Sequence, residues 1–143
     1  MTTGLFKKIL IATDGSDRNR AAVEEGVRIG RLCGSEVHAV YVADTSAFES
    51  TSAEGAMSDT WALLQSEAAT TLARVSTLAA GVDLKTVILE GKAAAAIVKY
   101  AQKEEIDLIV IGTQGKRGFE RFLLGSVAES VIRSAPCRVL VVK

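Results

Sequence analysis

The sequence contains few residues of several chemically important types, and each scarcity excludes a class of site. Among 143 residues there are one proline, one histidine and two cysteines. The cysteines, Cys33 and Cys137, are far apart and form no C-x-x-C pair, so the sequence spells out neither a zinc site nor a redox motif. We expect both cysteines to act as small buried apolar groups. We expect His38, inside a strand-like run, to be a packed or half-exposed residue and not a ligand.

The chain also lacks a net charge and any long hydrophobic run. Its 17 acidic and 17 basic residues cancel, so no overall field would draw the protein onto nucleic acid or an anionic membrane. No segment approaches the roughly 18 apolar residues of a membrane span, and the start of the chain has no signal-peptide pattern. We therefore expect a cytoplasmic protein with neither nucleic acid nor membrane as a partner.

The two commonest phosphate-binding motifs are absent as well. A Walker A loop needs Ser or Thr after its Gly-Lys pair, but Lys116 is followed by Arg117. The dinucleotide fingerprint G-x-G-x-x-G does not occur after the first strand-like run or near the end of the chain. A phosphate site in this protein must therefore be built in another way.

A glycine-rich stretch at residues 112–126, GTQGKRGFERFLLGS, is the strongest indication of a binding site. It follows the run LIVI at residues 108–111, which is typical of a strand buried on both faces, and it precedes a helical pattern. Gly125 and Ser126 stand at the expected helix start, where backbone N–H groups can face an anion. Three cations of the stretch suit a polyphosphate: Lys116, Arg117 and Arg121. A glycine-rich surface turn capped by Ser126 is the alternative.

Strand-like and helix-like segments alternate along the rest of the chain. We expect strands at residues 9–12, 37–42, 84–89, 107–111 and Arg138–Val142. We expect helices after Ser16 or Asp17, from Trp61, at residues 93–103 and at residues 127–133, with Ser16 or Asp17 capping the first and Gly34 ending it. Residues 44–58 show no period, and we expect a mobile loop there.

This alternation predicts one α/β domain over residues 1–143, a doubly wound parallel sheet of five strands with helices on both faces. Ligands of such sheets bind beyond the carboxyl ends of the strands, where the strand order reverses. If the first and fourth strands flank that point, Asp14 faces the glycine-rich stretch. It could then bond a ribose or an adenine edge, or help to hold Mg²⁺. Its alternative role is a second cap for the first helix.

Three stretches together resemble the universal stress protein family, and the resemblance covers essentially the whole chain. They are ILIATDGS at residues 9–16, the pattern Gly112-x₂-Gly115-x₉-Gly125-Ser126, and PCRVLVV at residues 136–142. The second is similar to the family's ATP-binding signature. The resemblance implies a five-stranded parallel sheet of order 3-2-1-4-5. Ala12 and Ala93 depart from the family pattern, since many relatives have proline at these positions.

The resemblance also implies a ligand and its contacts: ATP or another adenine nucleotide, with Mg or Mn. Asp14 would contact the nucleoside and could hold the metal, Val42 would pack against adenine, and Gly125 with Ser126 would bind phosphate. The glycines of the stretch would let the backbone approach the ribose and phosphates. The whole set of candidate contacts is Ala12, Thr13, Asp14, Val42, Ile111, Gly112, Gly115, Lys116, Arg117, Gly125, Ser126 and Val127.

The function implied by the resemblance is that of a nucleotide-dependent regulatory module of the stress response, with a protein partner that the sequence does not identify. It also implies a homodimer through Arg138–Val142, an apolar edge strand whose open N–H and C=O groups favour self-pairing. We expect slow ATP hydrolysis or autophosphorylation at most, because the glycine-rich stretch has no histidine and one carboxylate, Glu120. A nucleotide-free homodimeric scaffold is the open alternative.

Overall fold

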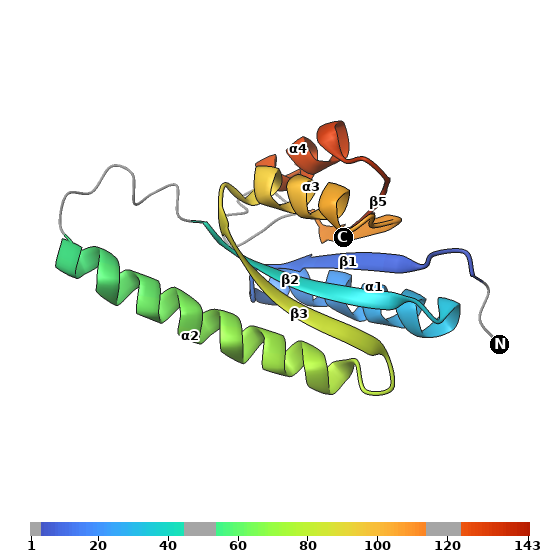
Figure 1. Ribbon diagram of the computed structural model, residues 1–143, viewed down its shortest axis with the longest axis horizontal. Helices are drawn as coiled ribbons and strands as arrows, with labels where there is room; N and C mark the ends of the chain where they lie inside the picture. Colours follow the sequence, from blue (N-terminus) through green and yellow to red (C-terminus); the bar gives the residue numbers. More distant parts are fainter. Residues whose placement is uncertain (1–3, 45–53, 114–123) are drawn as a thin grey trace.

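The strand-like runs form one parallel sheet in the computed structural model, which describes residues 4–44, 54–113 and 124–143 (Figure 1). The elements follow in the order β1 (Lys8–Thr13), the 3-10 turn η1 (Asp17–Asn19), α1 (Arg20–Cys33), β2 (Glu36–Asp44), α2 (Glu54–Leu78), β3 (Asp83–Gly91), α3 (Ala93–Lys103), β4 (Leu108–Gly112), α4 (Ser126–Ser134) and β5 (Arg138–Val142). The strand order is β3-β2-β1-β4-β5, and every neighbouring pair is parallel. The predicted fold class and strand order are confirmed.

Two helices cover each face of the sheet, and successive residues of β1 show the division. Ile9 and Ile11 belong to the core beneath α1 and α2, whereas Leu10 and Ala12 belong to the core beneath α3 and α4. Figure 1 shows the two helix pairs on opposite sides of the strands. A strand that is covered on both faces must be apolar at consecutive positions, which is why these strands appear in the sequence as unbroken apolar runs.

Helix α1 approaches the sheet closely because two glycines face it. A Cβ added at Gly26 would lie 2.6 Å from both Cγ1 and Cδ1 of Ile11, and one added at Gly30 would overlap Cγ2 of Val37. The helix ends, as predicted, at Gly34, whose φ of 68° is the left-handed conformation of a C-terminal cap. The small residues of α1 thus set its distance from β1 and β2.

We expect Gly26→Ala to lower the free energy of unfolding by about 1–3 kcal/mol, although alanine favours a helix over glycine. The new methyl group would overlap Ile11, which is fully buried, so that α1 or β1 would have to move. Urea denaturation measures the change. The control is Ala21→Gly at an exposed position of the same helix, which should cost about 1 kcal/mol through helix propensity alone. A more stable Gly26→Ala protein would contradict the close approach.

Helix α2 is longer than the sequence pattern predicts. It begins at Glu54 and not at Trp61, inside the segment where we expected a loop, and residues 45–53 of that segment lie outside the described part of the chain. From Asp59 on, where the side chains of α2 are described, the buried ones are Ala68, Leu72 and Val75. The start of the helix projects beyond the strands in Figure 1, and its sequence shows no apolar period.

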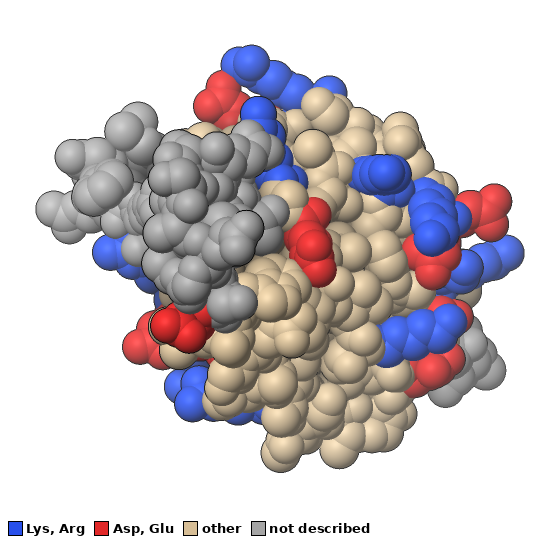
Figure 2. All heavy atoms as spheres, turned by 60° about the vertical axis from the view of Figure 1, so that its left-hand side comes forward, with Lys and Arg blue, Asp and Glu red and all other residues tan. Residues whose placement is uncertain are grey.

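One face of the protein carries charges of both signs that are not segregated into separate patches. Figure 2 shows Lys and Arg side chains interspersed with Asp and Glu on one face, where uncharged residues cover much of the surface between them. Over the described ranges, none of the helices has a stretch both long and apolar enough to cross a membrane.

Candidate functional site

The strand order reverses between β1 and β4, so the carboxyl ends of these two strands mark the switch point of the sheet. The chain runs from β1 outward to β2 and β3 on one side, and β4 and β5 lie on the other. The register pairs Ile11 with Val110. Continued by two residues, it sets Thr13 opposite Gly112. Doubly wound sheets bind their ligands at this point.

The turn after β1 is held by hydrogen bonds to its own side chains. The Asp14 N–H donates to Oδ1 of Asn19 (3.0 Å), and the Ser16 N–H donates to Oδ1 of Asp14 (2.9 Å). The Gly15 N–H donates to Oγ1 of Thr13 (3.1 Å), and Gly15 has a φ of +81°, which glycine adopts without strain. Asp14 is therefore held, partly exposed, at the edge of the switch point.

The first helix starts differently from the prediction. The prediction that Ser16 or Asp17 caps it is wrong, because a one-turn 3-10 helix intervenes and neither the Ser16 nor the Asn19 N-cap forms a side-chain cap hydrogen bond. The Oγ of Ser16 is buried and has no hydrogen-bond partner among the described residues. The acceptor that orders the turn is Asn19, only 6% exposed. Its role could not be predicted from the sequence, since a single amide five residues after Asp14 matches no common motif.

We expect Asn19→Ala to cost about 1–3 kcal/mol of stability, because the Asp14 N–H would lose its acceptor inside the protein. Asn19→Leu separates hydrogen bonding from packing, since leucine keeps the side-chain volume and lacks the acceptor. Both variants should unfold at lower urea concentration than the wild type. A Leu variant as stable as the wild type would show that the side chain matters through packing alone.

A hydrogen bond joins the two ends of the glycine-rich stretch. The Gly125 N–H donates to the carbonyl of Thr113, the residue after β4, at 2.6 Å. Gly125 is the N-cap of α4, with extended backbone angles of −64° and 155°, and its carbonyl accepts the Glu129 N–H at 3.0 Å. The helix N–H groups before that first bond have no partner within the helix. The positive end of α4 therefore lies beside the carboxyl end of β4.

The apolar candidates share one face of the sheet. Ala12 and Ile111 are buried in the core beneath α3 and α4, and the half-buried Val42 packs against the same core. Thr13 belongs to the other face, where it lines a pocket between α1 and α2. Four of the predicted cation and glycine positions lie outside the described residues: Gly115, Lys116, Arg117 and Arg121.

The groups whose pKa values are clearly shifted lie away from the switch point. Glu36, the first residue of β2, bonds Nζ of Lys85 at 3.0 Å and Nε2 of His38 at 2.8 Å. These bonds hold the pKa of Glu36 below its ordinary value, and Glu36 in turn raises the pKa of Lys85. Because a carboxylate only accepts, Nε2 of His38 donates to Glu36, and in this tautomer Nδ1 accepts the Tyr100 O–H at 2.7 Å. We call these four residues the His38 network.

The His38 network explains the one histidine of the chain. His38 is 1% exposed and both of its ring nitrogens are bonded, so the prediction of a packed residue is confirmed. Tyr100 belongs to α3, and burial raises the pKa of its hydroxyl, which keeps it a neutral donor. The network therefore ties α3 to β2 and β3 at the end of the sheet where β2 begins.

We expect the wild-type protein to lose stability more steeply than Glu36→Gln as the pH falls below 4.5, the ordinary value of a glutamate. The folded pKa of Glu36 lies below the unfolded one, so its contribution is present above the unfolded value and is lost as the pH falls through the folded value. Urea midpoints at neutral and acidic pH measure the difference. Glu129→Gln, which removes an exposed carboxylate paired with Arg133, controls for net charge. Equal slopes for the wild type and Glu36→Gln would contradict the expectation.

Cysteine and metal chemistry add little to the site. Cys33 is buried as predicted, but Cys137 is only half-buried beside the core beneath α3 and α4, where burial raises the pKa of its thiol. Within the described ranges, no three His, Cys, Asp or Glu side chains are grouped as a metal would need.

Known proteins with similar sequences and structures identify the family of this chain. Residues 5–143 match the universal stress protein family. A universal stress protein of Methanocaldococcus jannaschii is 48% identical over 141 residues, 97% of this chain and 83% of that protein. The solved structure of the hypothetical protein MJ0577 has a TM-score of 0.85 and 32% identity, covering 97% of this chain and 96% of the other.

A second solved structure holds a nucleotide. It is that of the universal stress protein from Archaeoglobus fulgidus in complex with dAMP, with a TM-score of 0.68 and 26% identity, covering 97% of this chain and 99% of the other. The match to the family spans nearly the whole sequence, and the fold and its switch point agree with it. This chain belongs to the universal stress protein family.

Proposed function

We propose that this protein binds ATP in the crevice between the carboxyl ends of β1 and β4, and that the bound nucleotide makes it a regulatory module of the stress response. The observation that carries the proposal is the hydrogen bond from Gly125 to Thr113. It brings the N-terminus of α4, a favourable place for phosphate, to the switch point of the sheet.

Each part of the nucleotide meets groups of matching chemistry. The adenine ring would pack on the apolar face that Ala12, Val42 and Ile111 share. Asp14, held at the edge of β1, would accept from the ribose hydroxyls or the adenine amino group and could hold Mg²⁺ or Mn²⁺ with the phosphates. The phosphates would lie at the start of α4, where Ser126 and the N–H of Val127 could donate to them.

Membership of the family supports an adenine nucleotide over other ligands. The relative from Archaeoglobus fulgidus was solved with dAMP. The choice of ATP over a monophosphate rests on the sequence, which places Lys116, Arg117 and Arg121 in the glycine-rich stretch. The described residues of the crevice supply backbone donors and apolar surface, so we propose binding as the activity, with slow hydrolysis or autophosphorylation at most.

The test is to denature freshly purified protein, identify any released nucleotide by chromatography, and titrate the emptied protein with Mg-ATP by calorimetry. Asp14→Asn keeps the oxygen that accepts the Ser16 N–H and removes the charge, and we expect it to weaken binding by about tenfold. Asp17→Asn, three residues later on η1, is the matched control and should bind as the wild type does. No released nucleotide and no heat of binding would favour the alternative, a nucleotide-free scaffold.

The proposal includes a homodimer formed through Arg138–Val142. β5 is the edge strand beside β4, and its four residues after Arg138 are only half-buried. The adjoining α4 exposes Val127 and Ile132, at 37% and 44%. Pairing two copies of β5 across a two-fold axis would satisfy the open strand edge. A monomer mass by light scattering at micromolar concentration would contradict the proposed homodimer. The cytoplasmic location and the protein partner stay predictions from the sequence.

A further inference from the structure

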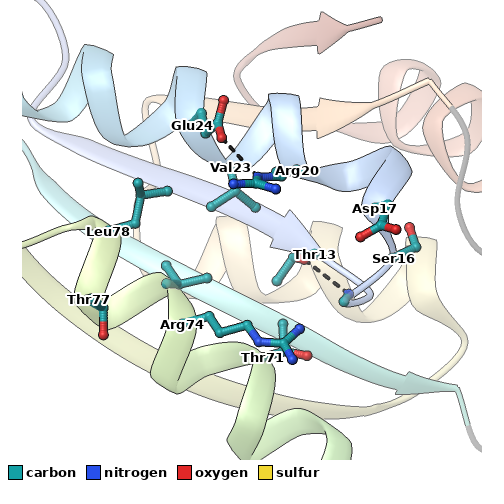
Figure 3. A pocket seen from close by; sticks show the side chains of 12 residues that line it. Thr13, Ser16, Asp17, Arg20, Val23, Glu24, Thr71, Arg74, Thr77 and Leu78 are labelled. Carbon is teal, nitrogen blue, oxygen red and sulfur yellow. Dashed lines mark hydrogen bonds and ion pairs between the residues drawn. The ribbon is translucent and has the colours of Figure 1, made fainter.

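A pocket of about 450 Å³ lies between α1 and α2, beside the turn that follows β1 (Figure 3). Its volume falls in the range of roughly 300–1,000 Å³ that is usual for small-molecule sites. Arg31 of α1 donates to the carbonyls of Leu78 and Ala80, both at 3.2 Å, and so ties α1 to the end of α2. The two walls of the pocket are thereby fixed relative to each other.

Apolar side chains line one part of the pocket. Val23 of α1 and Val75 of α2 are buried core residues that reach the lining, and Leu78 stands beside them with 42% of its surface exposed. An apolar chain of a few carbons would remove this surface from water, which is favourable. The part of the ligand that contacts these residues is therefore expected to be apolar.

The charged residues of the lining leave one cation available. Arg20 is paired with Glu24 at 3.1 Å. Arg74, in contrast, forms no hydrogen bond or ion pair with another described residue, and Figure 3 shows its side chain beside Thr71 on the pocket side of α2. Asp17 on η1 is the fourth charged residue of the lining, so two acidic and two basic side chains give the lining no net charge. One unpaired guanidinium and a neutral lining suit a ligand with a single negative charge.

We propose that this pocket is a second ligand site, which takes a small amphiphilic monoanion: a carboxylate bound by Arg74 and a short apolar chain laid against Val23, Val75 and Leu78. Thr71, one turn before Arg74, adds a hydroxyl beside the guanidinium. A dianion is disfavoured, because Asp17 also faces the pocket. The site is thus suited to a fatty or aromatic monocarboxylic acid of low mass.

The pocket and the nucleotide crevice share the turn after β1. Thr13, Gly15 and Ser16 line the pocket, and Asp14 between them is the proposed nucleoside contact. Gly15 contacts α2 closely, since a Cβ there would lie 2.5 Å from Oγ1 of Thr71. A ligand that changes this contact would act on Asp14, and by linkage each ligand would change the affinity for the other equally. This coupling rests on the proposed function, whereas the existence of the pocket site does not.

The experiment titrates octanoate into the full chain without nucleotide and follows backbone amide shifts by NMR. We expect saturable shifts at Gly15, Thr71 and Leu78. Octylamine, with the same chain and a positive head group, and inorganic phosphate, without the chain, should bind at least about tenfold more weakly. Arg74→Gln should weaken octanoate binding by about tenfold or more, the usual effect of losing a charged hydrogen-bond partner. Arg28→Gln, at an exposed position of α1 outside the lining, should leave it unchanged.

Several outcomes would overturn the proposal. Shifts that fail to saturate, or that occur away from the pocket, would show that it is no site. Octylamine binding as tightly as octanoate, or an Arg74→Gln variant that binds normally, would show that the carboxylate is not recognised. Phosphate binding as tightly as octanoate would show a plain anion site. Because no nucleotide is present, failure to bind ATP leaves these results unaffected.

Discussion

Gly125→Asp should weaken ATP binding by about 100-fold or more and leave the fold at least as stable as before. Gly125 is the N-cap of α4 with extended backbone angles, a conformation that any residue adopts. Aspartate is among the best N-cap residues, so the helix itself should gain stability. Its carboxylate would stand where the phosphates are proposed to bind, and a like charge at that distance costs several kcal/mol. Calorimetric titration with ATP and thermal denaturation measure the two effects.

Gly125→Asn is the matched control for this charge. Asparagine has nearly the same shape and an equal preference for the N-cap, but it is neutral. We expect it to bind ATP much more tightly than the Asp variant does. If both variants lost binding equally, the side chain would be acting through its size. If the Asp variant bound ATP as the wild type does, the phosphates would not lie at the start of α4.

The second large effect is expected at the other end of the sheet, where His38→Ala should cost about 3 kcal/mol of stability. The change leaves a cavity at a side chain that is 1% exposed. It also removes the partner of the Tyr100 hydroxyl and one of the two partners of Glu36. Urea denaturation measures the loss. Affinity for ATP should be unchanged in the folded protein, because β2 begins at this end and the crevice lies where the strands finish.

Tyr100→Phe tests the same network with a smaller change. It removes only the hydroxyl and leaves Nδ1 of His38 without its donor, so we expect a loss of about 1–3 kcal/mol. The two losses should not add in the double variant, because both break the same hydrogen bond. Full additivity, or a His38→Ala protein as stable as the wild type, would show that the His38 network does not hold α3 to the sheet.

The fold could be predicted because buried strands leave recognisable apolar runs in the sequence. The central strands β1 and β4 are buried on both faces, so their apolar runs are continuous. The bounds of the edge strand β5 were predicted to the residue. The start of α2 could not be predicted, because the helix begins in a segment whose sequence shows no apolar period. The strand order came from the family resemblance. The alternation of strands and helices along the chain predicts that the strands are parallel, but it does not predict their order in the sheet.

The candidate site was only partly accessible from sequence. The glycine pattern indicated the stretch between β4 and α4, and the structure places both of its ends at the switch point. The role of Asn19 was not accessible, because a hydrogen bond across a turn leaves no periodic trace in the sequence. The same holds for Arg74, whose availability depends on which of its neighbours are already paired. The loop positions Gly115, Lys116 and Arg117 stay predictions.

The hydrogen bond between Gly125 and Thr113 has a consequence for how such proteins diversify. It holds residues 113 and 125 in direct contact, so the two anchor points of the intervening segment are adjacent. Lengthening or replacing a segment between adjacent anchor points costs little entropy, and it need not disturb the strand and helix that anchor it. Related proteins could therefore differ in the length and sequence of this segment, and so in ligand preference. The sheet, its core and its helices would stay the same.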